Sequence, residues 1–157
     1  MLKIDVPSLF IVMTLNLAIM AVALPYFMGR VNRAARCAQA GIVLQTAGWI
    51  CLLSSSTFER GGWADHLLST LAMGCVSSGM VFNAIAFQLW CGQKPSVRVP
   101  AAIAALMTAG YGIGYADYPF RVAWANGLLA LQIATVVLTL CRRPQLPVGR
   151  WRWLLVI

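Results

Sequence analysis

Five long apolar stretches, separated by short polar gaps, account for most of the 157 residues and constrain the fold more than any other feature. An α-helix rises about 1.5 Å per residue, so about 20 apolar residues are needed to cross a hydrocarbon core of about 30 Å. With 61% hydrophobic and only 10% charged residues, the chain is also far from the composition of a soluble domain. The sequence therefore predicts an all-α, polytopic transmembrane helical bundle that forms a single integral membrane domain over residues 1–157. The predicted spans cover approximately residues 6–28, 37–58, 67–90, 99–115 and 120–141.

Charge divides the gaps between these stretches into two kinds. Nine of the twelve Lys and Arg residues lie in alternate gaps, whereas all four acidic residues lie in the other gaps or before the first stretch. Short cytoplasmic loops of membrane proteins are enriched in Lys and Arg, so the basic gaps are predicted to be cytoplasmic and the N-terminus external. The prediction is a multi-pass protein of the inner (plasma) membrane. The nine bases are Arg30, Arg33, Arg36, Lys94, Arg98, Arg142, Arg143, Arg150 and Arg152, and the acids are Asp5, Glu59, Asp65 and Asp117.

The net charge of +8 bears on the partner of the chain. It would indicate nucleic acid if the bases formed a patch on a polar domain. Here the bases flank apolar spans, which instead favours a lipid bilayer with anionic headgroups on the cytoplasmic side. We therefore expect no nucleic acid as a partner.

Both ends of the sequence leave alternatives open. Residues 21–23 (Ala-Val-Ala) resemble a signal-peptide cleavage site, but the long apolar run and Asp5 argue against cleavage of the first span. Residues 151–157 read as the opening of a sixth span, of which only seven residues are present. Either the chain is a fragment of a longer protein, which we favour, or this tail lies flat at the inner interface.

No residue pattern predicts catalysis, a metal or a cofactor. The five cysteines lack disulfide or metal-binding spacing, although Cys37, Cys91 and Cys141 share the predicted cytoplasmic edge, where a redox or metal role is the alternative. His66 is the only histidine, which argues against a haem held by two histidines of one chain. Because the loops are too short to build a closed active site, we expect no enzymatic activity from this chain.

The predicted external loops hold one set of titratable groups. Glu59, Asp65 and His66 share a loop, and Asp117 joins them if the third and fourth spans pack together. Since histidine titrates near neutral pH, such a cluster is compatible with a response to protons or cations. Independently solvated loop charges are the favoured alternative.

Neutral polar side chains occur within the predicted spans. No acidic or basic residue lies in the interior of a span, since Arg121 falls at the outer edge of the fifth, and this argues against an ion-driven transporter. Hydrogen bonds between helices are the favoured role of the neutral groups, and a ligand-sensing pocket is the alternative. The candidates are Asn16, Asn83, Asn126 and Gln132.

Small residues at four-residue spacing predict where helices pack. Gly110 and Gly114 form a Gly-x-x-x-Gly pattern in the fourth span, and Gly74 and Ser78 form a weaker version in the third. Small side chains let helix backbones approach closely, which supplies packing in a bilayer. Packing within the bundle is favoured, and a homodimer is the alternative use of the same pattern.

The order of these features resembles the N-terminal membrane region of bacterial GGDEF-type diguanylate cyclases. The matching features are an Asp-x-Pro opening, a basic break after the first span, a Gly-Trp pair in the second, a Gly-rich third span with a basic edge, and a basic aromatic start to a sixth. They lie at residues 5–10, 30–36, 48–49, 79–94 and 150–153.

This resemblance implies seven spans, a linking helix and a cytoplasmic domain that makes cyclic di-GMP from two GTP. The chain contains neither the Gly-Gly-Asp/Glu-Glu-Phe signature nor a phosphate-binding loop, so no catalytic residue is carried over. The expected function is a membrane-embedded signal-input and anchoring module. The alternative is a small self-contained membrane protein, such as a channel, a carrier of uncharged solute or a scaffold.

Overall fold

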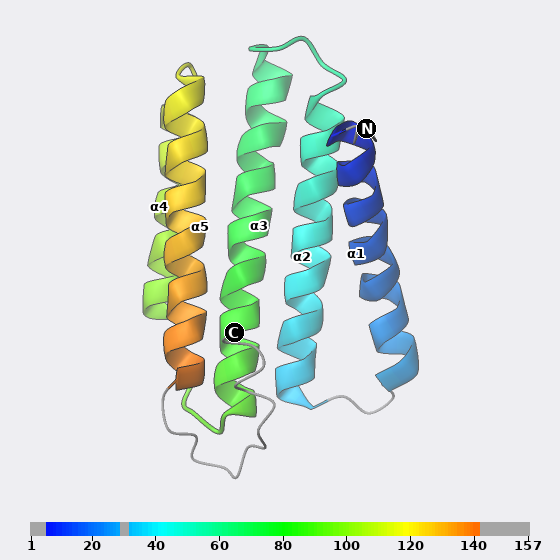
Figure 1. The fold of residues 1–157 in the computed structure, drawn as a ribbon, viewed down its shortest axis with the longest axis vertical. Helices are drawn as coiled ribbons and strands as arrows, with labels where there is room; N and C mark the ends of the chain where they lie inside the picture. Colours follow the sequence, from blue (N-terminus) through cyan, green and yellow to red (C-terminus); the bar gives the residue numbers. More distant parts are fainter. Residues whose placement is uncertain (1–5, 29–31, 142–157) are drawn as a thin grey trace, which may run out of the picture.

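Five α-helices run alternately up and down in the computed structural model, which describes residues 6–28 and 32–141 (Figure 1). These ranges contain helices and turns but no strand, which confirms the all-α fold. The predicted start of a sixth span, 151–157, lies outside the described residues. The helices are α1 (Val6–Met28), α2 (Arg33–Ser55), α3 (Trp63–Trp90), α4 (Arg98–Ile113) and α5 (Tyr118–Cys141).

Capping interactions explain where the helices begin and end. The Asn32 side chain accepts a hydrogen bond from the Ala35 N–H (2.9 Å), so α2 begins at Arg33 rather than at residue 37. The Asp117 carboxylate accepts one from the Phe120 N–H (3.1 Å) at the start of α5. At the end of α4, the Gly114 N–H donates to the Gly110 carbonyl, so Gly114 caps the helix rather than lying inside a span that reaches residue 115.

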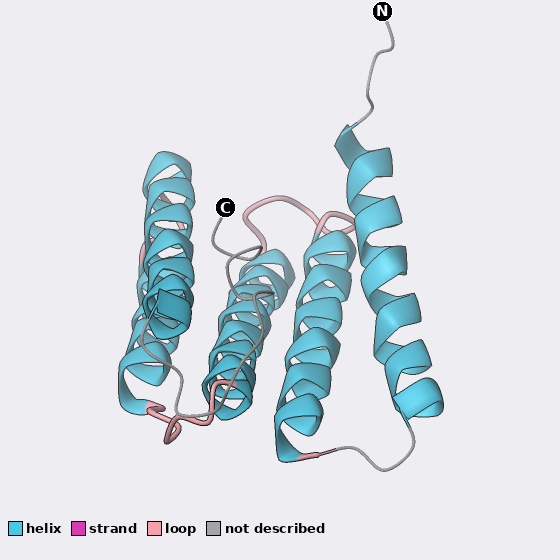
Figure 2. Cartoon of the chain, turned by 60° about the horizontal axis from the view of Figure 1, so that its bottom comes forward, coloured by secondary structure: helices cyan, strands magenta, loops and turns pink. Residues whose placement is uncertain are grey.

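α3 is the central helix of the bundle. It packs against α2 on one side and against α4 and α5 on the other, while α1 packs against α2 at the edge. Figure 2 shows the same order, with α4 and α5 together beside α3. An element that contacts three others is the natural place for the buried polar groups of the fold.

Small residues at every seventh position form the contact between α2 and α3. Seven residues are close to two helical turns, so such residues lie along one face. A Cβ atom placed on Gly79 would lie 2.7 Å from the Gly41 carbonyl oxygen, and one on Gly48 would lie 2.9 Å from that of Ala72. The two backbones therefore approach closely at these pairs. The buried small residues in this spacing are Ala34, Gly41, Gly48 and Ser55 on α2 and Ala72, Gly79 and Ala86 on α3.

Gly110 on α4 and Gly114 at its C-cap face aromatic rings of α5 instead of a helix backbone. The Trp124 indole occupies the space that a Cβ atom on Gly110 would need, and the Phe120 ring does the same at Gly114. The two rings stack with centroids 5.5 Å apart, and Trp124 Nε1 donates to the Leu106 carbonyl (3.2 Å). The glycines thus make room for rings, which bury a large apolar area against α4.

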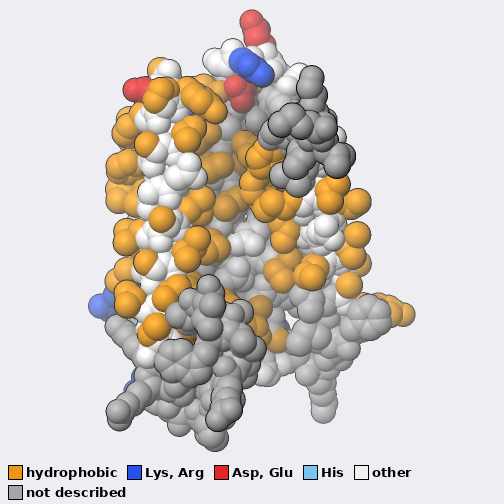
Figure 3. Space-filling model, viewed as in Figure 1, with side chains coloured by type: hydrophobic (Ala, Val, Ile, Leu, Met, Phe, Trp, Pro, Cys, Tyr) orange, Lys and Arg blue, Asp and Glu red, His pale blue; other side chains and the backbone are white. Residues whose placement is uncertain are grey.

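The sides of the bundle are apolar, as Figure 3 shows for one face. α2, α3 and α5 are long and apolar enough to cross a membrane. The 16-residue α4 is shorter than such a crossing needs, and in α1, which has 23 residues, the apolar stretch found covers Phe10–Ala23. The structure therefore supports a helical membrane protein with three candidate spans among the described residues, rather than the five that were predicted.

Charged side chains of the described residues separate to the two ends of the bundle. The loops 56–62 and 114–117 carry Glu59 and Asp117, and we call this the acidic end (Figure 3). The opposite end, which we call the basic end, carries four bases of the described chain: Arg33, Arg36, Lys94 and Arg98.

Candidate functional site at the acidic end

Four side chains from two helices and one turn meet at the acidic end. Asp65 and His66 lie in the first turns of α3, Tyr115 lies in the turn after α4, and Arg121 lies in the first turn of α5. The sequence analysis placed Asp65 and His66 in a loop, but α3 begins at Trp63. Because α3 has 28 residues, about 42 Å of helix, its first turns extend beyond the apolar part that would cross a bilayer.

Asp65 is held by two hydrogen bonds. Its Oδ2 accepts one from the Tyr115 hydroxyl (2.5 Å) and one from the Gly61 N–H (3.1 Å). Gly61 has a φ of 83°, a conformation that favours glycine and that directs its N–H back toward α3. The Tyr115 hydrogen bond, followed by the Gly61 bond and the positive charge of Arg121, lowers the pKa of Asp65 despite its partial burial. Asp65 is therefore a carboxylate that ties the turn after α4 to α3.

His66 makes a second connection between α3 and α4. Its ring stacks on Tyr115 with centroids 4.1 Å apart and an interplanar angle of 23°. Its Nε2 lies 3.0 Å from the Gly112 carbonyl oxygen, which accepts a hydrogen bond when Nε2 carries the proton. Gly112 belongs to the last turn of α4, where carbonyl groups lack partners within the helix. His66 thus caps the C-terminal end of α4.

Arg121 lies among three tyrosine rings. Its Cζ atom is 4.2 Å from the centroid of the Tyr115 ring and 5.4 Å and 5.6 Å from those of Tyr111 and Tyr118. Each contact is within the range of a cation–π interaction, which contributes about 0.5–2 kcal/mol. The Nε–H group of Arg121 is buried and has no hydrogen-bond acceptor among the described residues. Leaving such a donor unpaired costs about 1–3 kcal/mol.

A polar cavity of about 600 Å³ opens beside these side chains. It lies between the end of α2, the start of α3 and the turn between α4 and α5. Its lining combines hydroxyl groups, two arginines and one carboxylate. The lining residues are Leu52, Ser55, Ser56, Arg60, Gly61, Asp65, Ser69, Tyr111, Tyr115, Ala116, Tyr118 and Arg121.

The four residues proposed as a titratable cluster take different places. Asp65 and His66 both contact Tyr115. Glu59 is exposed on its loop, and Asp117 caps α5, so neither lines the cavity. Among the described residues, no group of three or more His, Cys, Asp or Glu side chains is arranged to hold a metal ion.

The sequence analysis did not single out the tyrosines or Arg121 as a site. A signal was nevertheless present. Tyr111, Tyr115, Tyr118 and Arg121 follow at spacings of four, three and three, which place residues on one side of a helical path. The path is interrupted by the turn at Gly114, yet the side chains still converge.

The four polar candidates within the predicted spans also differ. Gln132 is almost fully buried, and its Nε2 donates to the Ser77 carbonyl of α3 (3.2 Å). Asn83 is half-buried, with Oδ1 against the Cα side of Gly41 at the α2–α3 contact. Asn16 and Asn126 lie on exposed faces instead, because α1 and α5 are edge helices that use only part of their surface for packing.

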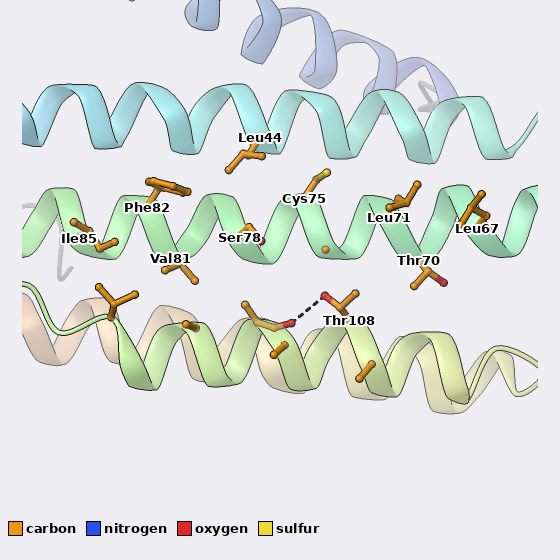
Figure 4. A pocket seen from close by; sticks show the side chains of 16 residues that line it. Leu44, Leu67, Thr70, Leu71, Cys75, Ser78, Val81, Phe82, Ile85 and Thr108 are labelled. Atoms are coloured by element: carbon orange, nitrogen blue, oxygen red, sulfur yellow. Dashed lines mark hydrogen bonds between the residues drawn. The ribbon is translucent and has the colours of Figure 1, made fainter.

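A second, apolar groove of about 820 Å³ runs between α3 and α4, with Leu44 of α2 at its edge (Figure 4). Gly74 and Ser78 line this groove rather than a tight helix contact; the nearest atom to a Cβ on Gly74 would be Thr108 Cγ2 at 3.4 Å. In Figure 4, Thr70 and Val81 point from α3 toward α4 across the groove. The Thr70 hydroxyl is buried and has no hydrogen-bond partner among the described residues.

Comparisons with known proteins give no further assignment. No family model matches the sequence, and no curated protein or solved structure shows significant similarity to it.

Proposed function

We propose that this chain is a membrane-embedded signal-input and anchoring module of the kind found before the catalytic domain of diguanylate cyclases. In this proposal five spans and the start of a sixth cross the inner membrane, the N-terminus and the acidic end face outward, and the basic end faces the cytoplasm and its anionic lipids. The chain itself has no enzymatic activity. The observation that carries the proposal is the acidic-end cluster, in which Asp65, His66 and Arg121 join three helices around a cavity.

The acidic-end cluster is suited to receiving a signal because only a few polar contacts hold it together. Two side chains of α3 hold the end of α4: Asp65 accepts a hydrogen bond from the Tyr115 hydroxyl, and His66 Nε2 pairs with the Gly112 carbonyl. A ligand or a change of charge in the adjacent cavity competes directly with them. At the basic end, the Gln93 side chain donates to the Thr139 carbonyl (3.2 Å) and so links the segment after α3 to α5. A shift of α4 or α5 at one end is thereby passed to the other, as a two-state change in helix packing.

A self-contained carrier or scaffold is the second candidate, and the groove between α3 and α4 favours it. The groove is almost entirely apolar and open along its length, as a site for an uncharged solute or a partner helix would be. The groove and the acidic-end cavity have no lining residue in common. The two candidates therefore place the functional site in different parts of the bundle.

The reading frame after Ile157 separates these candidates at once. Completion of a sixth and a seventh span, followed by a cyclase signature, supports the input module. A stop codon directly after Ile157 contradicts it and favours the self-contained protein.

A functional test uses the full-length protein in membrane vesicles. Arg121→Gln is compared with Arg98→Gln, a matched loss of charge at the exposed basic end. We expect the first variant to change cyclic di-GMP production and the second to leave it close to that of the wild type. Equal output from both variants counts against an input role for the acidic end.

A further inference from the structure

We propose that the acidic-end cavity binds a small anionic group, a carboxylate or a phosphate, with Arg121 as its main ligand and Arg60 as the second. The inference names the ligand class of the proposed input site and rests on that proposal only for the consequence of binding. It is carried by the balance of charges and hydrogen-bond partners around the cavity.

Arg121 brings a positive charge to the cavity without a direct polar partner among the described residues. Among the described residues its guanidinium takes part in no hydrogen bond and in no ion pair within 4.0 Å, and its Nε–H is buried without an acceptor. The helix dipole disfavours a cation in the first turn of α5, so the stability of that helix does not explain its position. The guanidinium lies over three tyrosine rings, and a planar group with several N–H donors is suited to binding an oxyanion.

The one carboxylate in the cavity is already engaged elsewhere. Asp65 accepts hydrogen bonds from the Tyr115 hydroxyl and the Gly61 N–H. Two arginines therefore face a single acid whose Oδ2 is shared by two donors. The remaining net charge of the lining is positive, which attracts an anion.

Three tyrosines around a cavity could also bind a cationic ligand, since aromatic rings form cages for ammonium groups. Here that place is taken, because Arg121 lies over the rings at 4.2–5.6 Å. A second cation would meet the charges of both arginines. Because Arg121 occupies the place of the cation, the three tyrosines position its guanidinium for an anion.

The experiment is a titration of inorganic phosphate and of acetate against the purified full chain in nanodiscs of zwitterionic lipid, followed by calorimetry at low ionic strength. We expect saturable binding that weakens at least about tenfold in Arg121→Gln and weakens in Arg60→Gln. Arg60 is exposed on a loop, so its variant keeps the fold and isolates the charge. The matched control, Arg98→Gln, removes an exposed base at the basic end and should bind as the wild type does.

The same anionic chemistry is offered by lipid headgroups, and a second arm separates the two sources. Thermal stability is measured in zwitterionic nanodiscs and in nanodiscs that contain phosphatidylglycerol, without free anion. Stabilisation by phosphatidylglycerol that falls further in Arg121→Gln than in Arg98→Gln, whose base also faces anionic lipid in the proposed orientation, identifies a headgroup phosphate. Titratable binding in zwitterionic lipid identifies a free anion.

The absence of both effects in the wild-type chain, or equal effects in Arg121→Gln and Arg98→Gln, overturns the anion site. Binding that depends on Arg121 while full-length output stays unchanged would instead overturn the input role and leave the anion site intact.

Discussion

Replacement of Gly79 by alanine tests the close contact between α2 and α3. A Cβ atom at this position would lie 2.7 Å from the Gly41 carbonyl oxygen and 2.7 Å from Gln45 Cγ, about 0.7 Å short of an ordinary contact of 3.4 Å. The Gln45 side chain can rotate away, but the carbonyl belongs to the backbone of α2, so the two helices must separate. Overpacking of this kind costs about 1–3 kcal/mol.

Two further terms set the size of the effect. Separation by 0.5–1 Å also removes about a quarter to a half of the dispersion energy of the atoms along the contact. Against this, alanine is the better helix former by about 0.5–1 kcal/mol. We therefore expect Gly79→Ala to lower the free energy of unfolding by about 1–2 kcal/mol.

Gly127→Ala on α5 is the matched control, because a Cβ atom there meets nothing within 4 Å. This variant gains the helix preference without a clash, and its stability should equal or exceed that of the wild type. The assay is denaturant unfolding in detergent, followed by far-ultraviolet circular dichroism. If Gly79→Ala is as stable as Gly127→Ala, the backbones of α2 and α3 do not touch at this pair and the proposed seam is wrong.

Four other expectations follow from the same contacts. In a background without native cysteines, Ser56→Cys at the acidic end should react with an impermeant thiol reagent in intact cells and Ser96→Cys at the basic end should not; the reverse pattern would reverse the proposed orientation. Gly110→Leu should displace the Trp124 indole, lower stability by about 1–3 kcal/mol and change the tryptophan emission spectrum, whereas an unchanged spectrum would contradict the ring contact. The pKa of Asp65 is lowered below its usual 3.8, so the carboxylate contributes stability above that pH and loses this contribution as the pH falls further. Asp65→Asn should therefore lose less of its folding stability on acidification than the wild type does. An identical acid transition in the variant would argue against the Tyr115 hydrogen bond. The purified chain should not turn over GTP, and turnover that disappears in a His66 or serine variant would contradict the proposed lack of enzymatic activity.

Hydropathy was sufficient to predict the helical fold and most of the helix positions, because apolar runs of this length in a membrane protein have few solutions other than a helix. Capping was harder to predict. Asn32 extends α2 toward the N-terminus and Gly114 ends α4 early, and each depends on a single local hydrogen bond rather than on the character of the whole run. The cap shifts the bounds of α4 more than its length, since the predicted stretch has 17 residues and the helix has 16, and both are shorter than a span needs.

Helix partners were less predictable than the helices. The four-residue glycine pattern at Gly110 marks a place for the Trp124 ring, while the seven-residue pattern through Gly41 and Gly79 marks the backbone contact. A spacing shows which residues share a face, but not which helix covers that face. The acidic-end site was missed for the same reason: Asp65 and Arg121 are 56 positions apart, and only the packing of α3 against α4 and α5 brings both to one cavity.

The unequal character of these contacts bears on how a signal would travel. α2 and α3 meet along a seam of small residues in which carbonyl groups leave no room for added atoms, so this pair is expected to move as one body. α4 packs directly on α3, borders the open groove along part of its length, and is tied to α3 at the acidic end through Asp65 and His66. A ligand that alters those two ties would change the position of the end of α4 relative to α2 and α3. α5 is connected both to α4, through its Trp124 and Phe120 rings, and to α3, through Gln132. The anion site and the groove would then be coupled: binding at Arg121 should change the width of the groove between α3 and α4, which distances between spin labels on these two helices can report.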